Sequence, residues 1–470
     1  MKKKITYLAV FFVTSLFLKA QISQKWLQLG TGTPKNQTSQ PSMAFDRHGN
    51  LFLAYTDQST PQNKATLKKF DGQTWTTLSN NFTPGQAQFI KLELDTAGVP
   101  YVAFQEPYPV TKKISVMKYN GTGWDTVGIR GFATADFNNP EISMNIDFNN
   151  NIQLAYRENA TGKASVISYY GINWSFVNSA NITEGDATKL SMAARGSHYY
   201  LAFSNGHRGG KLSVITQTIG GAWVYVGDTT LSTGPVDYIT CKIFGGTNNV
   251  FTGITFKDLS DDKAYLLSKT DFGIWSNVNS TPQSEGTANY VCLAKKRTEP
   301  FNGKYYCGYA DGTSGGNATV KQSHATVANG VSLVGKKGFT DTLGIFAGAF
   351  YATMGIDKYD SLYIAVQSFN EYVVFKYRSI NLNLAGIPQS NFNAQISIFP
   401  NPSNGHITTS IDNSLPYSMK LFNLDGKVLF ENHSEKGEDL TIDISNKTNG
   451  VYYIEIKQND KLTRTKVIKN

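Results

Sequence analysis

Short apolar runs bounded by turn residues recur along most of the chain. The first three cover residues 42–46, 51–55 and 65–70, and they are rich in β-branched and aromatic residues. Runs of this kind predict β-strands. A fourth strand begins at Trp75, after the turn Asp71-Gly72, which supplies the positive φ angles that a tight hairpin requires. The pattern therefore predicts a unit of four antiparallel strands.

This unit repeats along the chain at a nearly fixed period. The tryptophans follow one another at separations of 49, 49, 50, 49 and 52 residues. They are Trp26, Trp75, Trp124, Trp174, Trp223 and Trp275, and the chain has no others. Such a period is typical of repeat architectures. Four strands in about fifty residues predict the blade of a β-propeller.

The count of units predicts seven blades. The sixth unit ends at residues 330–335, where Val331 and Leu333 replace the Trp pattern. The seventh has only three strand-like runs, at residues 349–356, 362–366 and 372–377. Residues 25–30 form a fourth strand without a unit of its own. We therefore predict an all-β fold, a seven-bladed β-propeller whose N-terminal strand closes the last blade and leaves no free inner edge.

The two ends of the chain differ from the repeats. Residues 1–20 combine a basic start with an apolar run and a small residue, Ala20, which predicts a signal peptide. A membrane anchor is the alternative, but the run is too short, and no other apolar run approaches a spanning length, so we expect no transmembrane segment in the mature chain. We predict the propeller at 21–379, a linker at 380–394 and a small antiparallel β-sandwich at 395–470.

The C-terminal segment carries a recognisable set of short motifs. It contains Pro400-Asn401-Pro402 with Gly405, the run Leu421–Val428 that includes Gly426, the segment Gly450–Tyr453, and a terminal Lys466–Lys469. In this order the motifs resemble the type A C-terminal sorting domain of the type IX secretion system. The resemblance implies binding to the type IX secretion machinery and export from a Gram-negative cell. It also implies removal of the tail, with release or attachment at the outer cell surface.

Composition excludes some classes of function. Charged residues make up 17% of the chain, and the net charge of +9 includes four lysines of the signal segment, so no nucleic-acid footprint is present. No Cys/His spacing predicts a metal site, and we expect no cofactor. Cys292 and Cys307 lie on the first and second strands of the sixth unit; they either pair or remain two buried thiols. Cys241 is expected in the core.

Acidic residues recur where second strands end, two positions after an aromatic residue. If the units share a register, these residues surround the mouth of the central channel and could hold a cation or sugar hydroxyls. With their neighbours, the candidate ligand-binding residues are Asp57, Glu106, Tyr108, Arg157, Glu158, Asp258 and Asp311. The favoured alternative is structural, because a feature repeated in every blade usually serves the blade. Each acid would then pair with the Lys that begins the next strand: Lys64, Lys112, Lys163, Lys211 or Lys263.

One loop departs from this pattern and supplies the weak catalytic candidates. Here Asn205 replaces the acid, and His207 and Arg208 follow. A His suits proton transfer near neutral pH and an Arg can neutralise a carboxylate, as a uronate-cleaving lyase requires. An ordinary solvated loop is the favoured reading.

We expect a secreted or surface-displayed propeller that binds a polysaccharide or a surface partner without catalysis of its own. The alternative is a carbohydrate-active enzyme, a polysaccharide lyase or a glycosidase, and a third reading is a structural adhesin component. Residues 71–75 resemble part of the sialidase Asp box, but the spacing of its Ser, Asp and Gly is not reproduced, which argues against a sialidase.

Overall fold

The structure is a computed structural model that contains two compact units. One unit spans Ser23–Ser379, and the other contains Ile380–Asn470. The residues described are 25–30, 38–59, 61–107, 112–134, 141–195, 198–217, 221–245, 250–270, 273–277, 281–295, 304–324, 330–343, 349–368, 371–378, 396–411, 417–423, 427–434, 440–458 and 461–470. The predicted signal peptide and linker therefore lie outside the described residues.

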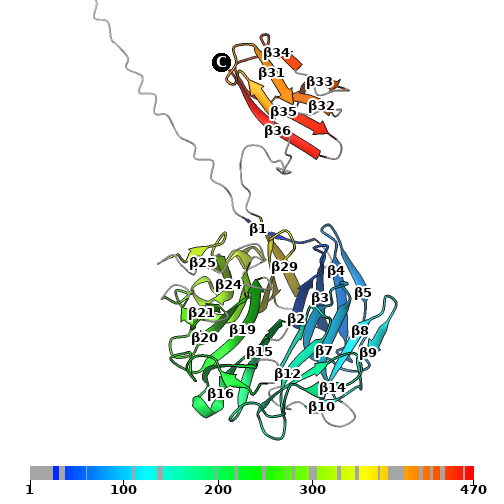
Figure 1. Cartoon of the computed structure of the whole chain (residues 1–470), viewed down its shortest axis with the longest axis vertical. Helices are drawn as coiled ribbons and strands as arrows, with labels where there is room; N and C mark the ends of the chain where they lie inside the picture. Colours follow the sequence, from blue (N-terminus) through cyan, green and yellow to red (C-terminus); the bar gives the residue numbers. More distant parts are fainter. Residues whose placement is uncertain are drawn as a thin grey trace, which may run out of the picture. The chain divides into compact units, whose positions relative to one another are not determined.

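The described part of the first unit forms seven antiparallel sheets, shown from blue to yellow in Figure 1. The first has β2 (Thr38–Phe45), β3 (Leu51–Asp57), β4 (Ala65–Phe70) and β5 (Trp75–Ser79). The second has β6 (Gln88–Leu94), β7 (Pro100–Pro107) and β8 (Lys112–Tyr119), which pairs with both β9 (Trp124–Thr126) and β10 (Ala133–Thr134). The third has β11 (Ile142–Ile146), β12 (Ile152–Arg157), β13 (Ala164–Tyr169) and β14 (Trp174–Phe176).

The later sheets repeat the same order. The fourth has β15 (Ala187–Arg195), β16 (His198–Asn205), β17 (Lys211–Gln217) and β18 (Val224–Tyr225). The fifth has β19 (Val236–Gly245), β20 (Val250–Asp258), β21 (Lys263–Thr270) and β22 (Ser276–Asn277). The sixth has β23 (Ala288–Lys295), β24 (Lys304–Asp311), β25 (Asn317–His324) and β26 (Ser332–Leu333). The described loops also contain the short 3-10 helices η1 (Gly206–Arg208), η2 (Gly312–Ser314) and η3 (Phe339–Leu343).

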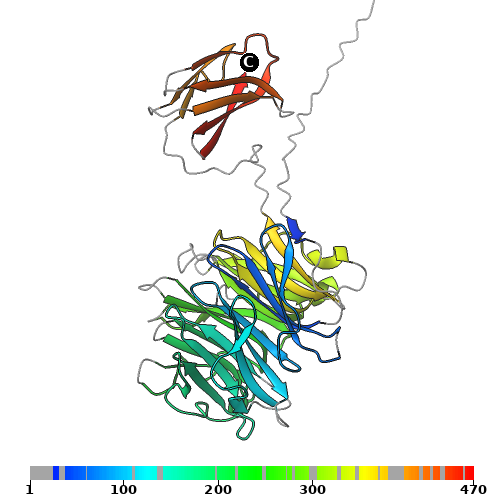
Figure 2. The same cartoon turned by 90° about the vertical axis from the view of Figure 1, so that its right-hand side faces the viewer.

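The last sheet joins the two ends of this unit. It contains β27 (Phe350–Ile356), β28 (Leu362–Ser368) and β29 (Glu371–Arg378), and its fourth strand is β1 (Lys25–Gln28). Lys25 lies opposite Arg378 and Trp26 opposite Tyr377, as predicted for the N-terminal strand. Figure 2 shows dark blue β1 beside the yellow strands.

The first strands of the sheets contact one another in cyclic order. β2 contacts β6, and the series continues through β11, β15, β19 and β23 to β27, which contacts β2 again. Serine side chains connect some of these inner strands. Ser42 Oγ accepts a hydrogen bond from Leu92 N (2.8 Å), Ser143 Oγ from Met192 N (2.9 Å), and Ser191 Oγ from Cys241 N (2.8 Å). A cyclic array of antiparallel sheets around inner strands is a β-propeller.

The tryptophans connect neighbouring sheets at the outer strands. Five indoles donate Nε1–H to a backbone carbonyl of the preceding sheet. The bonds are Trp26 to Val334 (2.8 Å), Trp75 to Leu29 (3.0 Å), Trp174 to Val127 (3.1 Å), Trp223 to Val177 (3.1 Å) and Trp275 to Val226 (2.8 Å). Each acceptor lies three residues after the Trp, or after Val331, of its own sheet. The third, fourth and last sheets therefore donate to one neighbouring sheet and accept from the other.

Four of the five acceptors are followed by a glycine with a positive φ, and Val177 is followed by Asn178, which also has a positive φ. Gly128 follows the acceptor Val127 and has a φ of 72°, in the left-handed region that favours glycine. A Cβ placed on Gly128 would lie 2.9 Å from the ring of Trp174. Glycine is therefore required here both by the backbone angle and by the close approach of the ring.

Trp124 is the exception, and a β-bulge explains it. Its expected acceptor is Leu78, but between β4 and β5 the register shifts, so that Leu67 lies opposite Ser79 and Lys68 opposite Thr77. Leu78 is the extra residue of this bulge. Trp124 Nε1 has no acceptor among the described residues, although the ring still stacks on Phe82 at 3.8 Å.

The described residues of the second unit form two antiparallel sheets that share one core. One contains β30 (Ile396–Phe399), β31 (His406–Ile411) and β34 (Leu440–Asp443). The other contains β33 (Val428–Ser434), β32 (Tyr417–Phe422), β35 (Gly450–Gln458) and β36 (Lys461–Lys469). Ile407 and Ile442 from the first sheet pack with Met419 and Ile454 from the second.

The exception at Trp124 provides a matched test of the indole hydrogen bond. Trp174→Phe and Trp124→Phe both shrink a ring that stacks on a Phe, but only the first removes a hydrogen bond. We expect Trp174→Phe to lower the free energy of unfolding by about 1–2 kcal/mol more than Trp124→Phe does, because Val127 O loses its donor. Urea denaturation of both variants measures the difference. Equal losses would show that the hydrogen bond contributes nothing to stability.

Candidate functional site

The predicted acidic positions lie at one end of the propeller. Second strands end there beside the start of first strands: Asp57 lies opposite Thr38, Asp258 opposite Val236 and Asp311 opposite Ala288. We call this end the loop end. The predicted residue Tyr108 lies outside the described residues.

Glu106 at the loop end is fully buried and neutralised from within its own sheet. Arg130 Nε contacts both carboxylate oxygens at 3.0 and 3.1 Å, and Nη2 contacts Oε2 at 2.5 Å. Ser115 Oγ donates to Oε1 at 2.5 Å. The bidentate pair satisfies a charge that would otherwise be costly to bury, so Glu106 has no exposed oxygen to offer a ligand.

Asp258 and Asp311 are also buried, and they hold loops through backbone amides. Asp258 accepts from Thr233 N (3.0 Å) and from Ser260 N (2.9 Å). Asp311 accepts from Thr313 N (3.0 Å) and from Thr319 Oγ1 (3.1 Å). Both carboxylates fix the local loop conformation.

The other predicted positions have local partners as well. Asp57 accepts from Ser59 N (2.9 Å), and Glu158 accepts from the hydroxyl of Tyr156 (2.8 Å). Arg157 Nε donates to Asp186 Oδ1 (2.9 Å), in the loop that leads to the next sheet. These partners differ from the lysines expected from the sequence. Lys64 and Lys163 take part through their backbone carbonyls, which accept from Asp57 N and Glu158 N at 2.8 Å.

His207 and Arg208 belong to a turn that occurs twice. Asn205 caps η1 by accepting from His207 N (3.1 Å), and Gly209 ends it with a φ of 68°. Asp311 caps η2 in the same way, and Gly315 ends it with a φ of 66°. His207 is exposed, and Arg208 Nη2 contacts Glu184 Oε2 at 3.2 Å. The conformation therefore does not depend on His or Arg, and the guanidinium already has a carboxylate partner.

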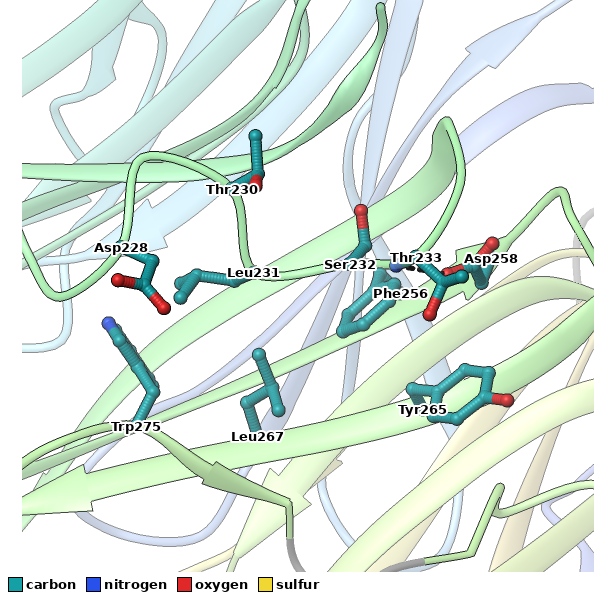
Figure 3. Close-up of a pocket in the computed structure, with 10 residues that line it drawn as sticks. All are labelled: Asp228, Thr230, Leu231, Ser232, Thr233, Phe256, Asp258, Tyr265, Leu267 and Trp275. Atoms are coloured by element: carbon teal, nitrogen blue, oxygen red, sulfur yellow. Dashed lines mark hydrogen bonds between the residues drawn. The ribbon is translucent and has the colours of Figure 1, made fainter. Parts of the chain in front are cut away.

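A cavity of about 290 Å³ lies beside Asp258 in the fifth sheet. Figure 3 shows its walls, which come from residues 228–233 and from strands β20 and β21. Phe256 and Tyr265 stack at 5.7 Å on one side, and Trp275 lies at the other end. The Tyr265 hydroxyl already donates to Asp261 (2.7 Å), and the Asp258 oxygens are held by amides. Two of the polar groups that line this cavity therefore already have partners within the protein.

The inner strands carry a second set of residues at the loop end, which the sequence reasoning missed. Several first strands have a β-bulge near their start, and the first bulge residue has a positive φ although it is not glycine. These residues are Phe89 (55°), Lys189 (55°), Tyr238 (50°), Tyr290 (53°) and Tyr351 (47°). The only signal in the sequence is a bulky residue at the same place near the start of successive first strands.

Charged side chains from the same inner strands interact with one another. Lys189 Nζ lies 3.2 Å from Asp237 Oδ1, and Lys242 Nζ donates to Met354 O at 3.2 Å. Glu93 is partly exposed but surrounded by protein, and this removal from bulk water raises its pKa to about 7, although Lys242 and Lys91 oppose the rise. Lys91 is solvent-accessible but also surrounded by protein, and the same removal from bulk water lowers its pKa, although Glu141 and Glu93 oppose the fall.

The cysteines do not pair. Cys241, Cys292 and Cys307 are free and buried. Cys292 lies opposite Gly308, and Cys307 opposite Leu293, so the two side chains point to opposite faces of the sixth sheet. Burial raises the pKa of the Cys292 thiol to about 12. Among the described residues, no group of three or more His, Cys, Asp or Glu side chains is arranged to hold a metal ion.

The predicted sorting residues take part in the second unit's backbone contacts. Asn401 Nδ2 donates to Lys466 O (2.7 Å), and its Oδ1 accepts from Ile468 N (2.9 Å), which ties the Pro400–Pro402 segment to β36. Gly405 has a φ of 151°, and a Cβ there would lie 3.1 Å from Ser445. Gly450 begins β35, whereas Gly426 lies outside the described residues.

The raised pKa of Glu93 predicts how stability depends on pH. A carboxyl with a folded-state pKa of about 7 and an ordinary value of 4.5 stabilises the fold fully below pH 4.5, and this contribution is lost as the pH rises to about 7. Between pH 4 and pH 8, we expect the free energy of unfolding of Glu93→Gln to rise by up to roughly 3 kcal/mol relative to that of the wild type. Urea denaturation at several pH values measures this gain.

Glu285→Gln is a control of opposite sign. Hydrogen bonds from Lys337 and Lys321 lower the pKa of Glu285 to about 2, so its contribution is present above pH 4.5 and is lost as the pH falls through about 2. Its replacement should cost stability at neutral pH. If the free energy of unfolding of Glu93→Gln differed from that of the wild type by the same amount at every pH, the raised pKa assigned to Glu93 would be wrong.

Comparisons with known proteins agree in fold only loosely. A fucose-binding lectin of Aleuria aurantia is 15% identical with a TM-score of 0.42, and the match covers 64% of this chain and 98% of the lectin. A microbial sialidase, Hz136, is 11% identical with a TM-score of 0.41, covering 63% and 65%. A protein of unknown function from Dyadobacter fermentans is 12% identical with a TM-score of 0.40, covering 75% and 98%. At these scores the likenesses carry no argument about what this chain does.

Among curated proteins no match to the chain was found. In the described residues no helix is both long and apolar enough to cross a membrane. The C-terminal residues do match a family. Residues 397–470 match the model of the secretion system C-terminal sorting domain. The chain therefore ends in a type IX sorting domain, as its motifs predict, and this domain directs it to secretion or to the cell surface.

Proposed function

We propose that this chain is an exported seven-bladed β-propeller that binds an extracellular ligand, a polysaccharide or a surface partner, without catalysis of its own. The single observation that carries the binding role is the set of aromatic and charged side chains that the inner strands bring to the loop end. Loops and rims on a rigid scaffold are where binding residues concentrate. The sorting domain supports the extracellular setting.

The finer features of this proposal rest on separate observations. Seven blades are supported by the cyclic contacts of the first strands and by the pairing of β1 with β29. We infer that the two sheets of the second unit form a sandwich, and that the sorting domain is of type A. We also keep the boundaries 1–20, 21–379, 380–394 and 395–470 for the signal peptide, propeller, linker and sorting domain.

Catalysis by His207 and Arg208 is the less favoured alternative. A lyase of uronate chains needs a proton acceptor and a cation free to neutralise the substrate carboxylate. Arg208 already faces Glu184, and the turn that presents both residues is built equally well with Thr313 and Ser314 in the sixth sheet. This similarity favours a structural turn over a catalytic loop.

Export is tested by removing the tail. Deletion of residues 395–470 should retain the propeller in the periplasm, because the secretion machinery recognises the C-terminal domain. Immunoblots of periplasm, cell surface and medium measure the distribution. The deletion leaves every strand of the first unit intact, and circular dichroism of the retained protein checks its fold. Normal release of the truncated chain would contradict the proposed role of the tail.

Binding and catalysis are separated by one panel of polysaccharides. We expect the purified chain to bind at least one of xylan, laminarin, alginate and polygalacturonate in affinity electrophoresis, without new unsaturated ends at 235 nm or new reducing ends. His207→Ala should bind like the wild type. Turnover that His207→Ala abolishes would instead establish the enzyme.

A further inference from the structure

The bulges of the inner strands hold side chains that the backbone itself does not favour. A positive φ at the first bulge residue suits glycine, and a bulky residue there is strained. Lys189 occupies the same backbone position as Tyr238, Tyr290 and Tyr351, so the bulge does not require an aromatic ring. Something other than backbone conformation therefore accounts for the aromatic residues at this position.

Three successive inner strands bring these rings together. Tyr238 and Tyr290 lie 4.9 Å apart between ring centroids, and Tyr290 lies 5.2 Å from Tyr351. Phe350, the neighbour of Tyr351, lies 5.9 Å from Tyr290. We call Tyr238, Tyr290, Phe350 and Tyr351 the aromatic rim. The planes of the contacting rings are tilted by 48°, 54° and 75° to one another, so the rings do not form a flat stack.

The aromatic rim is not buried like the core beneath it. Phe350 is 43% exposed and Tyr351 39%, whereas Tyr305 and Tyr309 on the neighbouring second strand are almost completely buried. Large aromatic residues gathered at an exposed rim mark a binding surface more often than scattered ones do. The cluster is also continuous, because each ring contacts the next across the sheet boundary.

Charged groups border one side of this surface. Asp237 directly precedes Tyr238, and its Oδ1 accepts from Tyr238 N (2.7 Å) and faces Lys189 Nζ at 3.2 Å. The side chains of Asp237 and Lys189 both remain partly accessible to solvent. The rim therefore combines apolar ring faces with an adjacent donor and an adjacent acceptor, the combination found in sites for small polar ligands.

We propose that the aromatic rim binds pyranose rings of a polysaccharide, whose apolar C–H faces pack on the Tyr and Phe rings while their hydroxyls bond to Lys189 and Asp237. This assignment rests on the proposed function and locates its site. Four rim residues present far less area than the roughly 800 Å² per partner of a stable protein–protein interface, which favours a sugar chain over a protein partner.

The test removes the most exposed rings and keeps a matched control. In the full-length chain, Phe350→Ser with Tyr351→Ser should weaken binding to the polysaccharide selected by the panel by about tenfold or more. Tyr351→Phe retains the ring and should bind within about threefold of the wild type. Tyr359→Ser removes a ring that is 71% exposed in the turn between β27 and β28, away from the loop end, and should leave binding unchanged. Isothermal titration measures the affinities, and thermal unfolding checks that each variant folds.

A second measurement needs no variant. Acetylation of the wild-type tyrosines with N-acetylimidazole, read by mass spectrometry, should slow at Tyr351 when the polysaccharide is present and remain unchanged at Tyr359. If the double variant binds the polysaccharide as tightly as the wild type does, and the polysaccharide does not slow acetylation of Tyr351, the proposed site is wrong. The proposed function would still stand. If the wild type binds a surface protein but no polysaccharide, and the double variant loses that binding, the sugar assignment is overturned. A wild type that binds nothing would overturn the proposed function itself.

Discussion

The propeller depends on a hydrogen bond from an indole to the backbone of the preceding sheet. The acceptor lies three residues beyond that sheet's own Trp, so one short strand carries both the donor and the acceptor. The rule has a consequence for ring closure. Trp26 donates to Val334, and Leu29 accepts from Trp75, so β1 supplies the connection to the sheets on both sides of it. The N-terminal segment therefore has two roles in closing the ring. It forms the edge strand of the last sheet, and its Leu29 carbonyl accepts the indole hydrogen bond from the first sheet.

Most polar side chains described at the inner strands and the loop end serve to hold the fold. Serine hydroxyls join some of the inner strands near the axis, and the loop-end carboxylates fix the loops through amides, hydroxyls and Arg130. These groups are already desolvated and hydrogen-bonded, so a ligand would gain little from them. The side chains at the bulge positions have other partners: the rings of Tyr238, Tyr290 and Tyr351 contact one another, and Lys189 pairs with Asp237. The backbone at these positions is fixed by the register shift while their side chains vary from Lys to Tyr, so they can differ between sheets without disturbing the ring.

The sequence predicts what is periodic and misses what depends on register. The Trp spacing indicates the sheets and the closing strand because five of the six indoles donate to the equivalent carbonyl of the preceding sheet. The partner of Glu106 could not be predicted, because Arg130 lies beyond the next hairpin strand. The cysteines show the effect most clearly. From the pairing of Ala288 with Asp311, an unbroken ladder would place Cys292 opposite Cys307, but the bulge after Asn289 shifts the register by one residue and turns the two thiols to opposite faces.

The same bulge that separates the thiols creates the rim. An extra residue in the first strand forces a positive φ, and the side chain at that residue leaves the alternation of the strand. Tyr290 is that residue in the sixth sheet, and Tyr238 and Tyr351 are its counterparts on either side. The second sheet places Phe89 there, and the fourth sheet, next to that of Tyr238, places Lys189, which pairs with Asp237. A ring of identical blades would have a symmetric mouth, whereas this sequence places tyrosines at the bulges of three successive sheets and a lysine, paired with Asp237, at the bulge of the sheet before them, and this asymmetry would give a bound chain a direction.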